Sequence, residues 1–121
     1  MSKNVNKPQQ LQIQIDKELL IYTTPDGKVK VEVLLRNENI WLTQDKMAEL
    51  FGIDRTGILK HLKNIFASGE LDEKSNVQKL HIANSDKPVK FYNLDAIISV
   101  GYRVNSHRAT LFRVWATEMT S

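Results

Sequence analysis

The chain has no cysteine, which excludes disulfides, thiolate metal sites and thiol nucleophiles. No apolar run approaches the ~20 residues that a membrane-spanning helix needs, and the polar start, MSKNVNKPQQ, lacks the apolar core of a signal peptide. Glycine-rich phosphate loops and the G-x-S-x-G nucleophile motif are also missing. These absences predict a cytoplasmic protein that makes no membrane contact, and they leave no pattern that supports an enzyme.

Metal and cofactor sites lack support as well. The three histidines, His61, His81 and His107, have no H-x-x-x-H spacing and no carboxylate motif beside them, so we expect no zinc site. The carboxylates within residues 70–73 follow Gly69 in a loop, and we expect them to form a turn or a helix cap rather than a metal site or an acid–base pair. The sequence therefore predicts neither a metal nor a cofactor.

Basic charge is distributed unevenly along the chain. The net charge of +3 and the pI near 9.2 permit a nucleic-acid partner without requiring one. Residues 37–54 are net acidic, whereas the stretch from Arg55 to Phe66 contains no acidic residue. The distribution of basic residues along the chain therefore indicates more about possible partners than the net charge does.

Residues 41–66 contain two short amphipathic helical patterns with a tight joint between them. Thr43 is a natural N-cap for the first helix, Gly52 is placed for a left-handed C-cap, and Asp54 can cap the second helix. The apolar positions are Met47, Ala48, Leu50 and Phe51 in the first helix and Ile58, Leu62 and Ile65 in the second. A small residue such as Ala48 lets two helices cross closely, so this layout predicts a helix-turn-helix.

The outward face of the second helix predicts contact with double-stranded DNA. It carries Arg55, Thr56, Lys60, Lys63 and Asn64, with His61 near its edge. A basic helix after a glycine turn suits the major groove, where Arg and Lys pair with phosphate or guanine and Asn pairs with adenine. Thr43 and Gln44 at the start of the first helix are expected to anchor a phosphate, because helix N-termini attract anions. The alternative is the solvated face of an ordinary helical hairpin.

A β-hairpin is expected before these helices. Residues 19–24 and 28–35 are strand-like and flank Pro25-Asp26-Gly27, a turn in which Pro fixes φ and Gly supplies a positive φ. Residues 40–42 can form a third strand that leads into the first helix. Residues 11–15 alternate apolar and polar side chains and form either a short strand or a lead-in.

A second hairpin is expected after the helices, within residues 76–93, with strands at 77–82 and 89–92 and a polar tip at 84–88. A hairpin in this position is a wing. Its lysines, Lys79, Lys87 and Lys90, either contact phosphates or keep an edge strand soluble.

Two helices are expected to close the chain. The first starts at Asn93 or Asp95, runs to Val104 and is apolar on nearly every side, as a buried helix is. Asn105-Ser106 caps the second. Its main apolar face consists of Ala109, Phe112, Trp115, Ala116 and Met119.

The last helix leaves some surface unassigned. Leu111 and Val114 lie off its main face, so apolar surface remains for another segment to cover. The chain stops at residues 120–121 without a C-cap signal, which suggests a fragment of a longer protein or a helix that forms a homodimer with a second copy. The basic residues near this helix serve as ion-pair residues or add phosphate contacts; they are Arg103, His107, Arg108 and Arg113.

Together these patterns predict an α+β fold, a winged helix-turn-helix with an N-terminal β-hairpin and two C-terminal helices. Residues 1–10 are expected to be disordered and residues 11–121 to form a single domain. The predicted function is duplex DNA binding, sequence-specific or general, in a regulator or mobile-element protein. The alternative is a protein–protein interaction module that does not touch DNA.

The strings WLTQ, MAELFGIDR, HLKNIF, GELDE and FYNLDAIISVGYRVNS, with WAT near the end, resemble the N-terminal region of the virulence protein RhuM family. The resemblance covers residues 31–117. It implies a bacterial, virulence-associated and DNA-binding protein that is longer than this chain. The region from Tyr102 to Met119 is more loosely similar to the end of phage antirepressor (Bro-type) N-terminal domains. Some relatives are described alongside Fic proteins, but the H-P-F-x-x-G-N motif of Fic enzymes is absent here.

The second helix departs from the pattern of related proteins, which usually read Arg-Ser-Thr-Ile-Ser-Arg-His where this chain reads RTGILKH from Arg55 to His61. Gly57 weakens the helix by roughly 1 kcal/mol relative to Ala. Leu59 places an apolar side chain where a polar one is usual. It can touch a thymine methyl group or face a protein partner.

Overall fold

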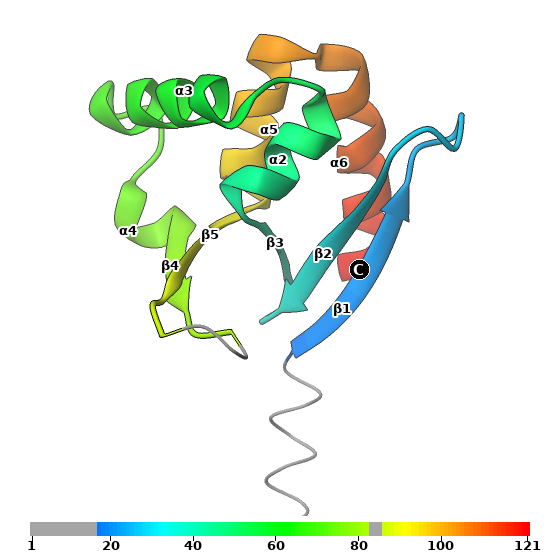
Figure 1. Ribbon diagram of the computed structural model, residues 1–121, viewed down its shortest axis with the longest axis horizontal. Helices are drawn as coiled ribbons and strands as arrows, with labels where there is room; N and C mark the ends of the chain where they lie inside the picture. The colour runs from blue at the N-terminus through cyan, green and yellow to red at the C-terminus, as the bar shows by residue number, and fades with distance from the viewer. Residues whose placement is uncertain (1–16, 83–85) are drawn as a thin grey trace, which may run out of the picture.

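The structure, a computed structural model, describes residues 17–82 and 86–121. It is a mixed α+β fold with a five-stranded antiparallel sheet and, in the described residues, five helices (Figure 1). The strands are β1 (Lys17–Thr23), β2 (Lys30–Arg36), β3 (Asn39–Leu42), β4 (Val77–Leu80) and β5 (Val89–Asn93). The helices are α2 (Gln44–Phe51), α3 (Arg55–Ala67), α4 (Glu73–Asn76), α5 (Leu94–Val104) and α6 (Ser106–Thr120). The predicted α+β class is therefore confirmed.

The N-terminal hairpin of β1 and β2 forms where the sequence predicted it, with Tyr22 paired to Val31 across the strands. Its turn is held by Thr24, whose hydroxyl donates to the Asp26 carboxylate at 2.7 Å and accepts from the Val29 N–H at 3.1 Å. The hydrogen bonds from the Thr24 hydroxyl and the Lys28 N–H lower the pKa of Asp26. A polar residue can be buried in this turn because its hydrogen bonds are made locally.

The chain crosses the sheet in the order β1-β2-β3-β5-β4. A tight turn at Asn37 and Glu38, both with positive φ, joins β2 to β3. After β3 the chain leaves the sheet for the helices and returns as the β4–β5 hairpin, in which β5 pairs with β3 through Trp41 and Asn93. The second predicted hairpin is thus confirmed, although β4 ends at Leu80.

Three expectations fall at least partly outside the described residues. They concern the disordered start at 1–10, the strand or lead-in at 11–15, and the hairpin tip, of which residues 84 and 85 are not described.

One hydrophobic core joins the sheet to α2, α3, α5 and α6. Figure 1 shows α6 running behind β1 and β2. The Tyr22 ring of β1 lies 5.0 Å from both Phe112 and Trp115 of α6, edge-on to Phe112. Aromatic rings prefer such edge-to-face contacts. The contacts of Tyr22 therefore hold the β1–β2 hairpin against α6.

Among the glycines, Gly101 of α5 has the closest neighbours. A Cβ atom at this position would lie 2.6 Å from the Phe51 ring and 2.7 Å from the Ala109 Cβ. Such distances are far below van der Waals contact. Glycine is therefore required at Gly101 for α2, α5 and α6 to pack as closely as they do. Ala48, which was expected at the separate crossing of α2 and α3, is partly buried and packs against the core.

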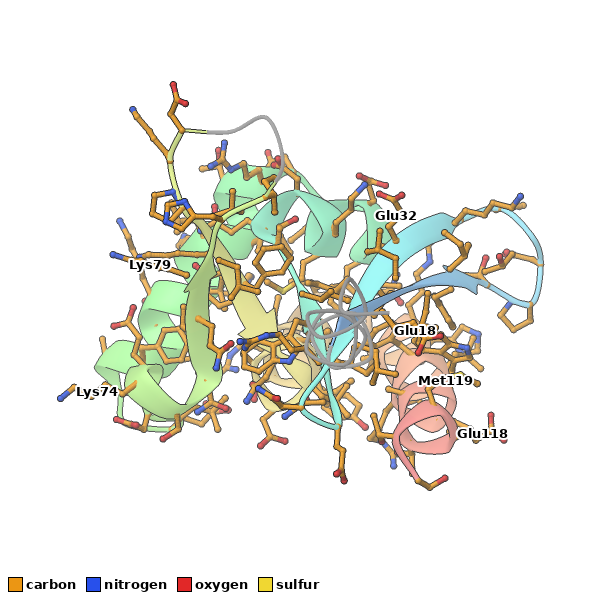
Figure 2. The ribbon with its side chains drawn as sticks, turned by 90° about the horizontal axis from the view of Figure 1, so that it is seen from below. Glu18, Glu32, Lys74, Lys79, Glu118 and Met119 are labelled. Atoms are coloured by element: carbon orange, nitrogen blue, oxygen red, sulfur yellow. The ribbon has the colours of Figure 1, made fainter. Side chains whose placement is uncertain are left out.

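The last turn of α6 differs from the sequence prediction. Met119 was expected on the buried face, but its side chain is 42% exposed. Figure 2 shows Met119 and Glu118 at the outer end of α6. Met119 lines a surface hollow with Leu35 and Arg36, and no described segment covers it there. The buried positions of the helix are Ala109, Phe112 and Ala116.

We predict that Gly101→Ala destabilises the protein, because the added methyl group would force apart Phe51 and Ala109. Overpacking of this kind costs about 1–3 kcal/mol, measurable by urea unfolding. Gly57→Ala is the matched control, since its Cβ would meet only side-chain ends at 3.2 Å. Equal losses for the two variants would contradict the assignment of Gly101 as the tight contact.

Candidate functional site

The caps that the sequence predicted are found at both ends of α2 and at the start of α3. The Thr43 hydroxyl accepts a hydrogen bond from the Lys46 N–H at 3.2 Å, and the Asp54 carboxylate accepts from the Gly57 N–H at 2.7 Å. Gly52 ends α2 in the left-handed region, with φ of +73°, and its N–H donates to the Ala48 carbonyl. The chain therefore changes direction within three residues and sets α3 at a fixed angle.

Helix α3 has one buried and one exposed face. Ile58, Leu62 and Ile65 are fully or almost fully buried. The exposed face carries the residues that the sequence singled out, namely Arg55, Thr56, Lys60, Lys63 and Asn64, with His61 partly buried at the edge. Leu59 lies among them and is also partly buried. The predicted cationic side chains thus point away from the core rather than into it.

The β4–β5 hairpin adds further positive charge beside α3. Lys90 lines a hollow of about 270 Å³ together with Thr43, Gln44 and Arg55. It also lines a second hollow with Lys63 and Leu59. The structure therefore brings Lys90 together with the starts of α2 and α3. Lys87, the other predicted wing residue, is exposed on the same hairpin but lines neither hollow.

Lys79 of β4 is the direct cross-strand partner of Lys90. Both side chains are exposed, and Figure 2 shows Lys79 projecting outward from the hairpin. Like charges placed opposite each other in an antiparallel pair are destabilising. The pairing of Lys79 with Lys90 therefore concentrates positive charge on the β4–β5 hairpin and lowers its stability.

Ion pairs neutralise only part of this surface. Arg55 lies 3.5 Å from the Asp45 carboxylate, in a pair that is well exposed on both sides. Within the part of the chain that the structure describes, no ion pair engages Lys60, Lys63 or Lys90. We call the exposed side of α3 together with Lys90 the cationic face.

Gln44, predicted as a phosphate contact, makes two side-chain hydrogen bonds within the protein. Its side-chain oxygen accepts from the Arg55 Nε at 3.1 Å, and its side-chain nitrogen donates to the Tyr92 hydroxyl at 3.0 Å. Gln44 therefore connects α2, α3 and β5, and it orients Arg55. No local pattern in the sequence indicates this connection, because its three members lie far apart in the chain.

The arginines near the C-terminus are engaged within the protein. Arg108 donates from Nη1 to the Leu50 carbonyl at 3.1 Å, which satisfies the C-terminal end of α2. Arg113 donates to the Tyr102 hydroxyl at 3.0 Å, and Arg103 forms an ion pair with Glu70. These contacts favour the structural alternative over phosphate binding. His107 is exposed.

The acidic segment before β4 forms a helix cap, as expected. Asp72 caps α4, with its carboxylate accepting from the Ser75 N–H at 3.0 Å. Among residues 17–82 and 86–121, no group of three or more His, Asp or Glu side chains gathers as a metal site requires. No helix in those ranges combines the length and apolar character of a bilayer span.

We predict that a double-mutant cycle with Gln44→Ala and Tyr92→Phe detects their hydrogen bond. Removal of a typical hydrogen bond costs about 0.5–1.5 kcal/mol, and contacting residues deviate from additivity. Tyr102→Phe, at a tyrosine in a different hydrogen bond, is the matched control and should combine additively with Gln44→Ala. Additivity in both cycles would rule out the connection through Gln44.

The pairing of Glu70 with Arg103 predicts a pH dependence. The hydrogen bond from Arg103 lowers the pKa of Glu70 in the folded state. A lowered folded-state pKa contributes stability above the unfolded-state pKa, and this contribution is lost as the pH falls through the folded-state pKa. Glu70→Gln should therefore lower Tm at pH 7, and the difference from the parent should disappear in acid.

Glu118→Gln provides the control for this measurement, because within the described chain the Glu118 carboxylate makes no ion pair. Its Tm difference should stay small at every pH. A Glu70→Gln difference that persists unchanged below the ordinary Glu range would disprove the electrostatic cause.

A protein-family model matches part of the chain. No curated protein and no solved structure matches the chain, and the likeness to phage antirepressor domains is not shown. The expected family resemblance is confirmed for the C-terminal part of the chain, from the approach to α4 to the end of α6. This segment, residues 71–121, matches the family model of the Virulence protein RhuM family.

Proposed function

We propose that the chain is a duplex DNA-binding domain of the winged helix-turn-helix type. In this proposal α3 enters the major groove and the β4–β5 hairpin acts as the wing. The observation that carries it is the cationic face, on which Lys60, Lys63 and Lys90 are exposed and, among the described residues, take part in no ion pair. Cations left unneutralised on a helix and an adjacent hairpin match the phosphate charge of a duplex.

The local geometry supports specific roles for these side chains. Arg55, oriented by Gln44, and Asn64 are suited to base edges, where Arg pairs with guanine and Asn with adenine. Lys63, Lys87 and Lys90 are suited to phosphates. The juxtaposed charges of Lys79 and Lys90 fit this role, because a bound phosphate backbone would relieve their repulsion.

The start of α2 supports a further phosphate contact. The Thr43 hydroxyl borders the hollow that also contains Arg55 and Lys90. A phosphate there would meet the helix N-terminus and the cations of Arg55 and Lys90, and it would compete with the Asp45 carboxylate, which lines the same hollow and pairs with Arg55. The proposal therefore keeps Thr43 as a phosphate contact and assigns Gln44 to positioning.

In the proposed role the chain has no catalytic activity of its own. It would act in the bacterial cytoplasm as part of a regulator, mobile-element or virulence-associated protein, with specificity that is either sequence-dependent or general. The family match over residues 71–121 is compatible with this role without specifying it.

A second candidate, a protein–protein interaction module, is favoured by one specific observation. Tyr102 and Val114, on α5 and α6, are 47% and 49% exposed, and Met119 at the end of α6 is 42% exposed. Exposed apolar side chains on two neighbouring helices suit a protein partner, including a second copy of the chain. In this alternative the C-terminal helix forms a homodimer and DNA is not contacted directly.

We predict that Lys60→Ala combined with Lys63→Ala weakens duplex binding and reduces its dependence on salt. Each phosphate contact contributes about −0.9 to the slope of log K against log salt concentration. Loss of two contacts should therefore flatten the slope by about 2, as measured by fluorescence anisotropy with a random-sequence duplex.

Lys28→Ala combined with Lys30→Ala is the matched control. Both lysines are exposed near the β1–β2 turn, at the opposite side of the molecule from α3 (Figure 1). This double variant removes the same net charge as the Lys60 and Lys63 variant, and it should leave most of the slope of log K against log salt concentration intact. Identical losses in the two double variants would show that net charge, rather than the cationic face, binds DNA. An association that ignores salt would instead favour the interaction module.

A further inference from the structure

Leu59 is an apolar side chain at the centre of the cationic face. It is four residues after Arg55 and four before Lys63, so the three side chains lie on one row of α3. It lines one hollow with Thr56, Lys60, Lys63 and Asn64. On its other side it lines the hollow that contains Lys90.

Leu59 is not part of the buried face of α3. The buried face of α3 consists of Ile58, Leu62 and Ile65. Leu59 belongs neither to the buried core nor to the partly buried side chains that pack against it. Phe66, seven residues further along on the same side of α3, does pack against the core and lines the second hollow with Leu59. Leu59 is thus apolar surface that folding leaves partly open to solvent. Lys60 and Lys63 border it on one side, and apolar side chains border it on the other, together with Lys90 and the Glu73 carboxylate.

The surroundings of Leu59 define what it can contact. A partner that covers the cationic face must be anionic, and it must offer an apolar group between its charges. Duplex DNA has this combination in the major groove, where the thymine 5-methyl group is the apolar feature of the base edges and phosphates lie on both sides.

We infer that Leu59 reads the 5-methyl group of thymine and makes recognition by α3 depend on it. The inference rests on the proposed DNA binding and adds to it a specificity-determining residue and its target. Lys60, Lys63 and Lys90 hold the phosphates that flank the groove. Leu59 then excludes water from the methyl group, and the burial of both apolar surfaces favours T·A pairs at that position.

The test compares two duplexes that differ only in this methyl group. A sequence is first selected from random duplexes by the parent chain, and it is then synthesised with either thymine or deoxyuridine at every T position. Burial of one methyl group corresponds to roughly a threefold to fivefold change in affinity. The parent should bind the thymine duplex tighter by about this factor.

Variants assign the effect to Leu59. Leu59→Ala should bring the thymine-to-uracil ratio to about one, whereas Leu59→Met should keep most of it because the side chain stays long and apolar. Lys60→Ala should weaken binding to both duplexes and leave the ratio unchanged. Circular dichroism melting of each variant verifies that the domain remains folded.

The outcomes separate this inference from the proposed function. If the parent binds no duplex at any salt concentration, the proposed function fails. If it binds thymine and uracil duplexes equally, or if Leu59→Ala keeps the parent ratio, DNA binding stands and the role of Leu59 is overturned. Equal binding together with a dimer in sedimentation that Leu59→Ala dissociates would assign Leu59 to contact with a second copy.

Discussion

The contact between Phe51 and Gly101 sets the geometry on which the remaining features depend. The Phe51 ring occupies space that any larger residue at Gly101 would fill. It thereby fixes the C-terminal end of α2 against α5 and α6. Arg108 of α6 binds the Leu50 carbonyl at the same end of α2. Gly52 then turns the chain directly beside these contacts. The packing at the C-terminal end of α2 therefore determines the direction of α3.

This arrangement explains why the exposed side of α3 can carry cations that no acidic side chain of the described chain neutralises. The helix obtains its stability from three buried apolar residues and from the Asp54 cap, so its outer side chains need no partner within the protein. The β4–β5 hairpin is attached to the same framework through β3 and through the Gln44 connection to Tyr92. Lys90 is consequently held at a defined position relative to α3.

Local signals in the sequence were sufficient to predict most elements. The caps at Thr43 and Asp54, the turn at Gly52 and the alternation of β2 depend on residues close together in the chain, and each is found where expected. Strand order and helix packing depend on distant contacts, which periodicity does not encode. The requirement for Gly101 could not be recognised from the sequence. The residues next to a glycine in a helix do not show which distant side chain packs against it.

The same division applies to the candidate site. The exposed cations of α3 follow from helical periodicity, since the apolar positions determine which side faces outward. The role of Gln44 and the pairing of Lys79 with Lys90 depend on tertiary contacts, and only the structure places them. The arginines near α6 were ambiguous in the sequence because Arg serves equally well in phosphate contacts and in helix capping.

The two tryptophans sit in different parts of the fold and can act as separate optical reporters. Trp115 packs beside Tyr22 and Phe112, so its emission depends on whether the first hairpin remains docked on α6. The Trp41 indole donates to the Arg36 carbonyl at 3.0 Å and is nearly buried within the sheet. Single-tryptophan versions would therefore show whether the hairpin detaches before the sheet opens, or whether both are lost in one cooperative transition.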